Sequence, residues 1–273
     1  MDEFDDAAKK QLRSEYLHRQ KMGRFRIGVS RIAILILFFA LWEVLTAKGI
    51  LNPFVFSSPS RILAALRDLS VSGALWKHIG TSVLETVSGF ASGTVLGILI
   101  AVALWWSPTV SKVLDPYLVV LNALPKTALG PIFIVCIGTG AGAIIAMTLA
   151  ISLIVTILNV LNGFQHTDAE KVKLMKMLGA NRLQTFRKLV LPANLSTIVN
   201  ALKINIGLSW VGVITGEFLV SKAGLGYLIV YGSQVFKMDL VMTSVAVLAV
   251  CAMVMHAGIV LLEKATRNKF HIS

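Results

Sequence analysis

The stretch TDAEKVKLMKMLGANRLQTFRKLVLP, residues 167–192, decides the fold because it places a polar, basic segment between two strongly apolar ones. Thr167 and Glu170 have the spacing of a capping box, in which each side chain accepts a backbone N–H of the other residue. A helix is therefore predicted to begin at Thr167. Gly179 can adopt the left-handed backbone that ends a helix, so this first helix has about three turns.

The second half of the segment repeats the pattern. Asn181 and Gln184 have the capping spacing again, and Pro192 is expected to stop the second helix because proline cannot continue the hydrogen-bond ladder. Helices this short are marginal in water on their own. The segment is therefore expected to gain stability by docking on a soluble partner.

The composition indicates a membrane protein. Hydrophobic residues make up 56% of the chain, charged residues 15%, and mean hydropathy is +0.76. A soluble domain carries about 25% charged residues. Six apolar runs come close to the roughly 20 residues that cross a bilayer, so we predict an all-α, polytopic fold. The runs are Ile32 to Ala47, Val83 to Trp106, Tyr117 to Ile137, Ala141 to Leu161, Ile198 to Val220 and Val241 to Leu262.

The positions of Lys and Arg predict the orientation. If the N-terminus lies inside, 18 of the 26 Lys and Arg residues fall on the inner side, 6 fall outside, and Lys126 and Lys203 lie within spans. Positive charge favours the cytoplasmic side. Both termini and residues 167–192 are therefore expected in the cytoplasm of a bacterial cell whose inner membrane the chain crosses. The net charge of +12 is then mainly a topology signal, with anionic lipid as a secondary partner and no nucleic acid.

Residues 1–26 are expected to form an uncleaved cytoplasmic tail, because they are too long and polar for the basic region of a signal peptide. Either an amphipathic helix over Ala7 to Arg26 on the inner leaflet or a solvated tail fits this composition. Residues 27–273 are predicted to form the transmembrane domain. Cys136 and Cys251 form no metal-ligand pattern, and no metal site is predicted.

The sequence lacks the usual motifs of ATP hydrolysis and of acyl or metal chemistry. It contains no phosphate loop of the G-x-x-x-x-G-K-[ST] type, no H-E-x-x-H and no G-x-S-x-G. No catalytic residue and no cofactor are therefore predicted in this chain. If the protein uses ATP, another chain must hydrolyse it.

Gly179, followed after nine residues by Leu189 to Pro192, resembles the signature of ABC importer permeases, an E-A-A triplet, a glycine and I-x-L-P. The triplet here is Lys173, Leu174 and Met175, which departs from the usual acidic-small-small pattern. The resemblance implies a coupling helix over about residues 167–179 that seats on the ATPase subunit. The residues assigned to this coupling role are Thr167, Asp168, Glu170, Lys173, Leu174, Met175, Gly179, Leu191 and Pro192.

Two further motifs resemble the nitrate, sulfonate and taurine branch of these permeases. They are Leu124 to Phe133 with Gly138, and Glu217 with Gly224 to Tyr227. The resemblance covers roughly residue 57 to the C-terminus and implies a six-helix type I importer domain that transports a small, anionic solute. The same branch includes permeases for bicarbonate, cyanate and thiamine-pyrimidine precursors, so a pyrimidine precursor is the alternative solute.

The third apolar run contains the residues expected along a translocation path. Pro125 and Pro131 interrupt its helix, and irregular backbone is tolerated in a membrane where it lines a cavity or is buried in protein. Lys126 lies about 15 Å into this run by helical rise. Such a lysine either faces the inner vestibule and favours an anion, or pairs with a carboxylate or snorkels.

Glu217 and the glycines at 224 and 226 are the candidate outer gate. A flexible glycine-rich backbone suits a gate, but a simple turn after the span fits equally well. Gly89, Gly93 and Gly97 recur at every fourth position and allow close helix approach. They form either a sliding seam or ordinary tight packing.

The family resemblance implies partners as well as a fold. We expect two ATP-binding subunits that carry ATP and Mg, a second copy of this chain in a homodimer, and an extracytoplasmic solute-binding protein. A stand-alone secondary transporter or channel and a membrane enzyme are the competing classes. No inverted repeat, clustered intramembrane charge or catalytic pair supports either of them.

Overall fold

The computed structural model describes residues 2–270, of which the side chains at most positions before 25 and after 264 are not described. Within this range every regular element is helical, which confirms the all-α prediction. The elements are α1 (Asp2–Ala47), α2 (Pro53–Phe56), α3 (Pro59–Val71), α4 (Ala74–Trp106), α5 (Pro108–Ala123), the 3₁₀ helix η1 (Lys126–Leu129), α6 (Gly130–Ile137), α7 (Ala141–Gln165), α8 (Ala169–Met177), α9 (Arg182–Thr185), the π-helix η2 (Phe186–Val190), α10 (Leu191–Ala193), α11 (Leu195–Val220), α12 (Leu225–Gln234) and α13 (Met238–Phe270).

The six predicted spans correspond to five long apolar helices and one bent pair in the described residues. The five are Phe25–Ala47, Ala74–Trp106, Ala141–Gln165, Leu195–Val220 and Met238–Lys264. The bent pair is Pro108–Ala123 with Lys126–Ile137, and its two parts meet at 87°. The helices extend beyond the apolar runs, because a helix does not stop where its residues become polar.

The chain forms two compact units, residues 1–64 and 65–273. In the first unit, α1 is one helix from Asp2 to Ala47, so the predicted tail over 1–26 continues without a break into the first span. Glu43, an acid within that span, accepts hydrogen bonds from the backbone N–H and the hydroxyl of Ser60 at 3.0 and 2.7 Å. It thereby satisfies a free N–H in the first turn of α3.

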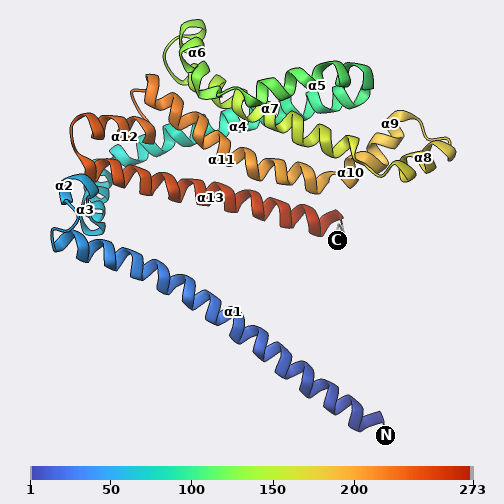
Figure 1. The fold of residues 1–273 in the computed structure, drawn as a ribbon, viewed down its shortest axis with the longest axis horizontal. Helices are drawn as coiled ribbons and strands as arrows, with labels where there is room; N and C mark the ends of the chain where they lie inside the picture. The colour runs from blue at the N-terminus through green and yellow to red at the C-terminus, as the bar shows by residue number, and fades with distance from the viewer. Residues whose placement is uncertain (1, 271–273) are drawn as a thin grey trace. The chain divides into compact units, whose positions relative to one another are not determined.

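The second unit is built around α7, which packs between α4 and α11 (Figure 1). Gly89, Gly93 and Gly97 of α4 face the small hydroxyl residues Thr148, Ser152 and Thr156 of α7. A Cβ on Gly89 would lie 2.5 Å from the Thr148 methyl carbon, and a Cβ on Gly212 of α11 would lie 2.9 Å from the Thr148 Cα. Thr148 is therefore held between two glycines, and the glycine row packs within the chain.

Each hydroxyl of this row is satisfied inside its own helix. Thr148, Ser152 and Thr156 donate to the carbonyls four residues earlier, at 2.9, 3.0 and 2.7 Å. Such bonds pair these three hydroxyls within the apolar seam. The hydroxyl residues thus supply small side chains without the cost of a buried, unsatisfied donor.

The apolar core is densest where α4, α5, α7 and η2 meet at one end of the unit. Its centre is aromatic: the ring of Phe186 lies 5.5 Å from that of Phe164 and 5.0 Å from that of Trp105, measured between centroids. Figure 1 shows α8 and α9 beyond this end of α7 and α11, and α6 and α12 toward the other end. The core therefore anchors the segment at residues 167–192 to the membrane helices. The buried residues are Ala101, Leu104, Leu118, Ile157, Val160, Leu161, Phe164, Phe186, Val190 and Ala201.

Candidate functional site

The first helix of the segment, α8, begins one residue later than predicted. The carboxylate of Asp168 accepts the backbone N–H groups of Glu170 and Lys171, at 2.9 and 3.4 Å, and is the N-cap. The predicted capping box between Thr167 and Glu170 is therefore wrong. Asp168 is the N-cap in place of Thr167 because its carboxylate makes charge-assisted hydrogen bonds at the positive end of the helix, which a hydroxyl cannot.

The hydrogen bonds around Asp168 favour its charged form. The Glu170 N–H, followed by the Lys171 N–H and ammonium group, lowers the pKa of Asp168 below its ordinary value. Thr167 has another role: its hydroxyl accepts a hydrogen bond from Asn194 at 2.8 Å, and Asn194 also donates to the Val190 carbonyl at 2.8 Å. This bridge joins the start of the segment to its end.

The end of α8 is as predicted. Gly179 has φ +78°, the left-handed conformation, and its N–H donates to the Lys176 carbonyl at 3.0 Å while the Ala180 N–H donates to the Met175 carbonyl at 3.0 Å. These bonds close the last turn in the manner of a Schellman motif. Three large apolar side chains near this end are exposed: Leu174 at 56%, Met177 at 77% and Leu178 at 73%.

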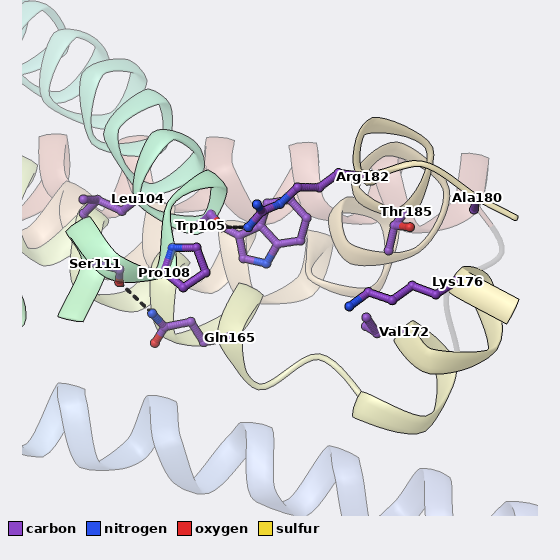
Figure 2. Close-up of a pocket in the computed structure, with 10 residues that line it drawn as sticks. All are labelled: Leu104, Trp105, Pro108, Ser111, Gln165, Val172, Lys176, Ala180, Arg182 and Thr185. Atoms are coloured by element: carbon purple, nitrogen blue, oxygen red, sulfur yellow. Dashed lines mark hydrogen bonds between the residues drawn. The ribbon is translucent and has the colours of Figure 1, made fainter.

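The second short helix, α9, begins with the predicted capping box. The Gln184 N–H donates to the Asn181 side chain and the Asn181 N–H donates to the Gln184 side chain, both at 2.8 Å. Arg182 in this helix extends over the Trp105 ring, with its guanidinium carbon 5.4 Å from the ring centroid, and donates to the Trp105 carbonyl at 3.1 Å (Figure 2). This stacking holds α9 against the end of α4.

Pro192 does not stop the second helix, so that prediction is wrong. The chain stays helical through the π-turn η2 and α10 to Ala193, and Pro192 lies in the first turn of α10. The Leu191 N–H donates to the Phe186 carbonyl, five residues back. The wider π-turn accommodates the proline, because Pro192 has no N–H for the regular ladder and its ring would crowd the carbonyl four residues earlier.

The predicted path residues lie at the elbow between α5 and α6. Pro125 is the N-cap of η1, and Pro131 lies in the first turn of α6, where its missing N–H leaves no bond unmade. The ammonium group of Lys126 donates to the Asn122 carbonyl at 2.8 Å, and no carboxylate pairs with it among the described residues. Gly130 lies against Leu219, since a Cβ there would be 2.6 Å from the Leu219 side chain.

Glu217 is 1% exposed and organises the turn after α11. One carboxylate oxygen accepts the Ser82 hydroxyl at 2.5 Å, and the other accepts the Gly226 N–H at 2.5 Å. The Leu225 N–H donates to the Ser82 oxygen at 2.7 Å. Gly224 has φ +116°, a conformation that other residues rarely adopt. The structure thus brings the three predicted gate residues together, while the gate role itself stays a prediction.

Two residues of α4 that complete this cluster were missed from the sequence. Ser82 bridges Glu217 and Leu225, and the imidazole Nδ1 of His78 accepts the Gly224 N–H at 2.9 Å. Glu85 lies beside them with one carboxyl oxygen, Oε2, unpaired. The available signal was the recurrence of polar residues near every fourth position of an otherwise apolar helix, which places them on one face. Among the described residues no three His, Cys, Asp or Glu side chains gather as a metal site would require.

Comparison with known proteins identifies the family of the chain. Residues 93–268 match the family described as binding-protein-dependent transport system inner membrane component. The chain is 28% identical to a putative aliphatic sulfonates transport permease protein of Bacillus subtilis, over 90% of each chain. It is 24% identical to the taurine transport system permease protein of Escherichia coli, over 92% of this chain and 94% of that protein.

A third relative and a solved structure extend the comparison. The chain is 29% identical to a formylaminopyrimidine transport permease protein of Halalkalibacterium halodurans, over 70% of this chain and 76% of that protein. A chain of the MetNI methionine ABC transporter in an inward-facing conformation has the same fold, with a TM-score of 0.63 and 18% identity over 70% of this chain and 95% of that one. This chain therefore belongs to the family of binding-protein-dependent transport system inner membrane components and is an ABC transporter permease.

Proposed function

We propose that this chain forms the translocation path of an ABC importer and that α8 is the coupling helix that docks on a separate ATPase subunit. The exposed apolar side chains of α8 carry this proposal. Leu174, Met177 and Leu178 lie outside the membrane-spanning segments and are all more than half exposed. Contiguous apolar surface of this kind marks a site of protein association.

The ends of α8 make it a suitable rigid docking element. Its N-terminus is capped by Asp168, its C-terminus is closed at Gly179, and the Asn194 to Thr167 bridge fixes its base. A preordered helix loses little conformational freedom when it binds. The charged residues of α8 include Lys173 at the first triplet position, so the matching surface of the ATPase is expected to be apolar with acidic groups at its edge.

Co-purification tests the docking role. Met177→Asp would remove the packing of the methionine side chain on the ATPase and place an unpaired charge in an apolar contact. Association with the ATPase should therefore weaken by about 2 kcal/mol, roughly 30-fold. Val71→Asp places the same charge at a comparably exposed apolar position in α3 and should leave association unchanged. Equal binding by both variants would refute the assignment of α8.

The solute is proposed to be a small anion of the sulfonate or taurine type. Two relatives carry those solutes in their names, and Lys126 at the α5–α6 elbow has no carboxylate partner among the described residues. The formylaminopyrimidine relative makes a pyrimidine precursor the second candidate. Lys126→Met should then reduce uptake of taurine or an alkanesulfonate while complex assembly stays intact. Unchanged uptake would show that Lys126 does not select for charge.

The proposed assembly contains two copies of this chain, two ATP-binding subunits with ATP and Mg, and an extracytoplasmic solute-binding protein. Both termini and α8 are assigned to the cytoplasm on the distribution of Lys and Arg. A single cysteine introduced at Lys173 should react with a membrane-impermeant maleimide in inside-out vesicles and stay protected in intact cells. The reverse pattern would contradict both the orientation and the coupling role.

A further inference from the structure

A cavity of about 530 Å³ lies between α8 and α9 on one side and the ends of α4, α5 and α7 on the other (Figure 2). It is separate from the exposed apolar residues of α8, none of which lines it. Its floor contains Trp105 and Pro108, and the amide of Gln165 donates to the Ser111 hydroxyl at 2.9 Å along one wall. The family assignment leaves this cavity without a function.

The charged side chains that line the cavity are cationic. Lys176 extends into it from α8 and Arg182 borders it from α9 (Figure 2). No acidic residue lines it, and neither cation forms an ion pair with a carboxylate among the described residues. Arg182 uses one N–H on the Trp105 carbonyl, which leaves other donors of its planar fork for a second acceptor. Two cations without a counter-charge around one space favour an anion in it.

A second cavity of about 410 Å³ adjoins the first, because Pro108, Ser111 and Gln165 line both. It adds one cation, Lys112, and one acid, Asp115. The combined space therefore keeps an excess of two positive charges.

The position along the membrane helices indicates where the anion comes from. Trp105 and Pro108, which lie on either side of the turn between α4 and α5, line the cavity. Tryptophans concentrate at the headgroup level of bilayers. From this turn α5 carries exposed apolar side chains, among them Val110, Val113 and Tyr117. An anionic head at the cavity and acyl chains along α5 would satisfy both surfaces.

We propose that this cavity binds the phosphate group of an anionic phospholipid, with Lys176 and Arg182 as its ligands and the ring of Trp105 beneath the headgroup. The guanidinium of Arg182 is oriented by its stacking on Trp105, so its fork is preorganised for phosphate oxygens. Lys176 supplies a second, flexible point charge. The lipid would connect α8 and α9 to the ends of α4, α5 and α7.

The test uses the purified full-length chain in zwitterionic nanodiscs, into which phosphatidylglycerol is titrated and bound lipid is counted by native mass spectrometry. Lys176→Gln and Arg182→Gln should each weaken retention of phosphatidylglycerol about fivefold, and the double variant about 25-fold, since a cation near an anionic surface contributes about 1 kcal/mol. Lys188→Gln removes an exposed charge of the same segment that does not line the cavity, and it should bind like the unaltered chain.

Three results would overturn the proposal. One is equal retention of phosphatidylglycerol by Lys176→Gln and the unaltered chain. This result is decisive even when Arg182→Gln fails to fold after losing its stacking on Trp105, because Lys176 makes no such contact. Another is equal loss in Lys188→Gln, which would indicate general charge attraction. The third is complete displacement of the lipid by millimolar inorganic phosphate, which would identify a site for free phosphate. The measurement needs no ATPase, so its failure would leave the docking role of α8 unaffected.

Discussion

Replacing Gly93 by alanine should force α4 and α7 apart locally and destabilise the fold. The Cβ of the new residue would overlap the Ser152 hydroxyl and lie 3.2 Å from the Leu149 carbonyl oxygen. Rotation of the hydroxyl would break its hydrogen bond to the Thr148 carbonyl and leave the Ser152 Cβ 3.2 Å away, and the Leu149 carbonyl belongs to the helix ladder of α7. The two helices must therefore separate or shift locally.

The free-energy cost of this overlap can be separated from the entropy gain of a glycine-to-alanine change by a second substitution in α4. Alanine for glycine in a helix gains about 0.5–1 kcal/mol from backbone entropy, whereas overpacking costs about 1–3 kcal/mol. Gly80 lies in α4 too, and a Cβ there meets nothing within 4 Å. Gly80→Ala therefore reports the entropy gain alone. The free energy of unfolding of Gly93→Ala should fall below that of Gly80→Ala by about 1–3 kcal/mol.

Equilibrium unfolding of the full chain in mixed micelles, followed by far-ultraviolet circular dichroism, measures the difference. The double variant Gly93→Ala with Ser152→Gly removes the overlapping side chain and should recover part of the loss, with a coupling energy of about 1–2 kcal/mol. Equal stability of Gly80→Ala and Gly93→Ala would refute the close packing of α4 on α7. Zero coupling would show that Ser152 is not the obstacle.

Substitutions at three further positions test other parts of the structure. Glu217→Ala leaves the Ser82 hydroxyl and the Gly226 N–H unpaired and should cost about 2–6 kcal/mol of unfolding free energy, whereas Glu217→Gln should keep the fold and allow binding-protein-stimulated ATP hydrolysis to test the gate. Hydrogen bonds in the folded chain lower the pKa of Asp168 below its ordinary value of 3.8. The charged Asp168 carboxylate should therefore stabilise α8 fully above pH 3.8, and this stabilisation should disappear as pH falls through the lower pKa of the folded chain. Amide exchange in α8 should show that loss, and Asp168→Asn should abolish the pH dependence. Asn181→Ala removes half of the α9 capping box and should cost about 1 kcal/mol, seen as a lower melting temperature.

Hydropathy predicted the spans because membrane insertion depends on the average over about 20 residues. It placed the start of α4 at Val83, whereas the helix begins at Ala74, since the first nine residues include polar positions that lower the average. The bend at Pro125 was predicted, because proline removes a donor wherever it occurs in a helix. Its angle of 87° was not, because the bend depends on how α6 packs on α7 and α11.

Local bonding was predicted only where one acceptor was available. Gly179 and the Asn181 box were correct, since no neighbouring residue competes for those roles. At Thr167 the adjacent Asp168 offered a better acceptor, and the choice depends on a charge difference that spacing alone does not encode. Ser82 lies 135 residues from Glu217 in sequence, so their contact arises from tertiary packing. No local pattern could have assigned it.

Helix α7 contacts elements at both ends of the second unit. Near its start a Cβ on Gly130 at the elbow would lie 3.2 Å from Met147, and at its other end Phe164 packs on Phe186 of η2, which follows α9. From Met147 to Phe164 a helix spans about 26 Å. Between these points Gly89, Gly93 and Gly97 of α4 each pack directly on α7. If one helix bent alone, a gap would form at one of these three contacts or atoms would overlap at another. With α8 docked on an ATPase as proposed above, a movement of α8 is therefore expected to displace α4 and α7 together as one body. Gly93→Ala, which loosens that body at its middle level, should reduce the coupling of ATP hydrolysis to uptake even at temperatures where the fold survives.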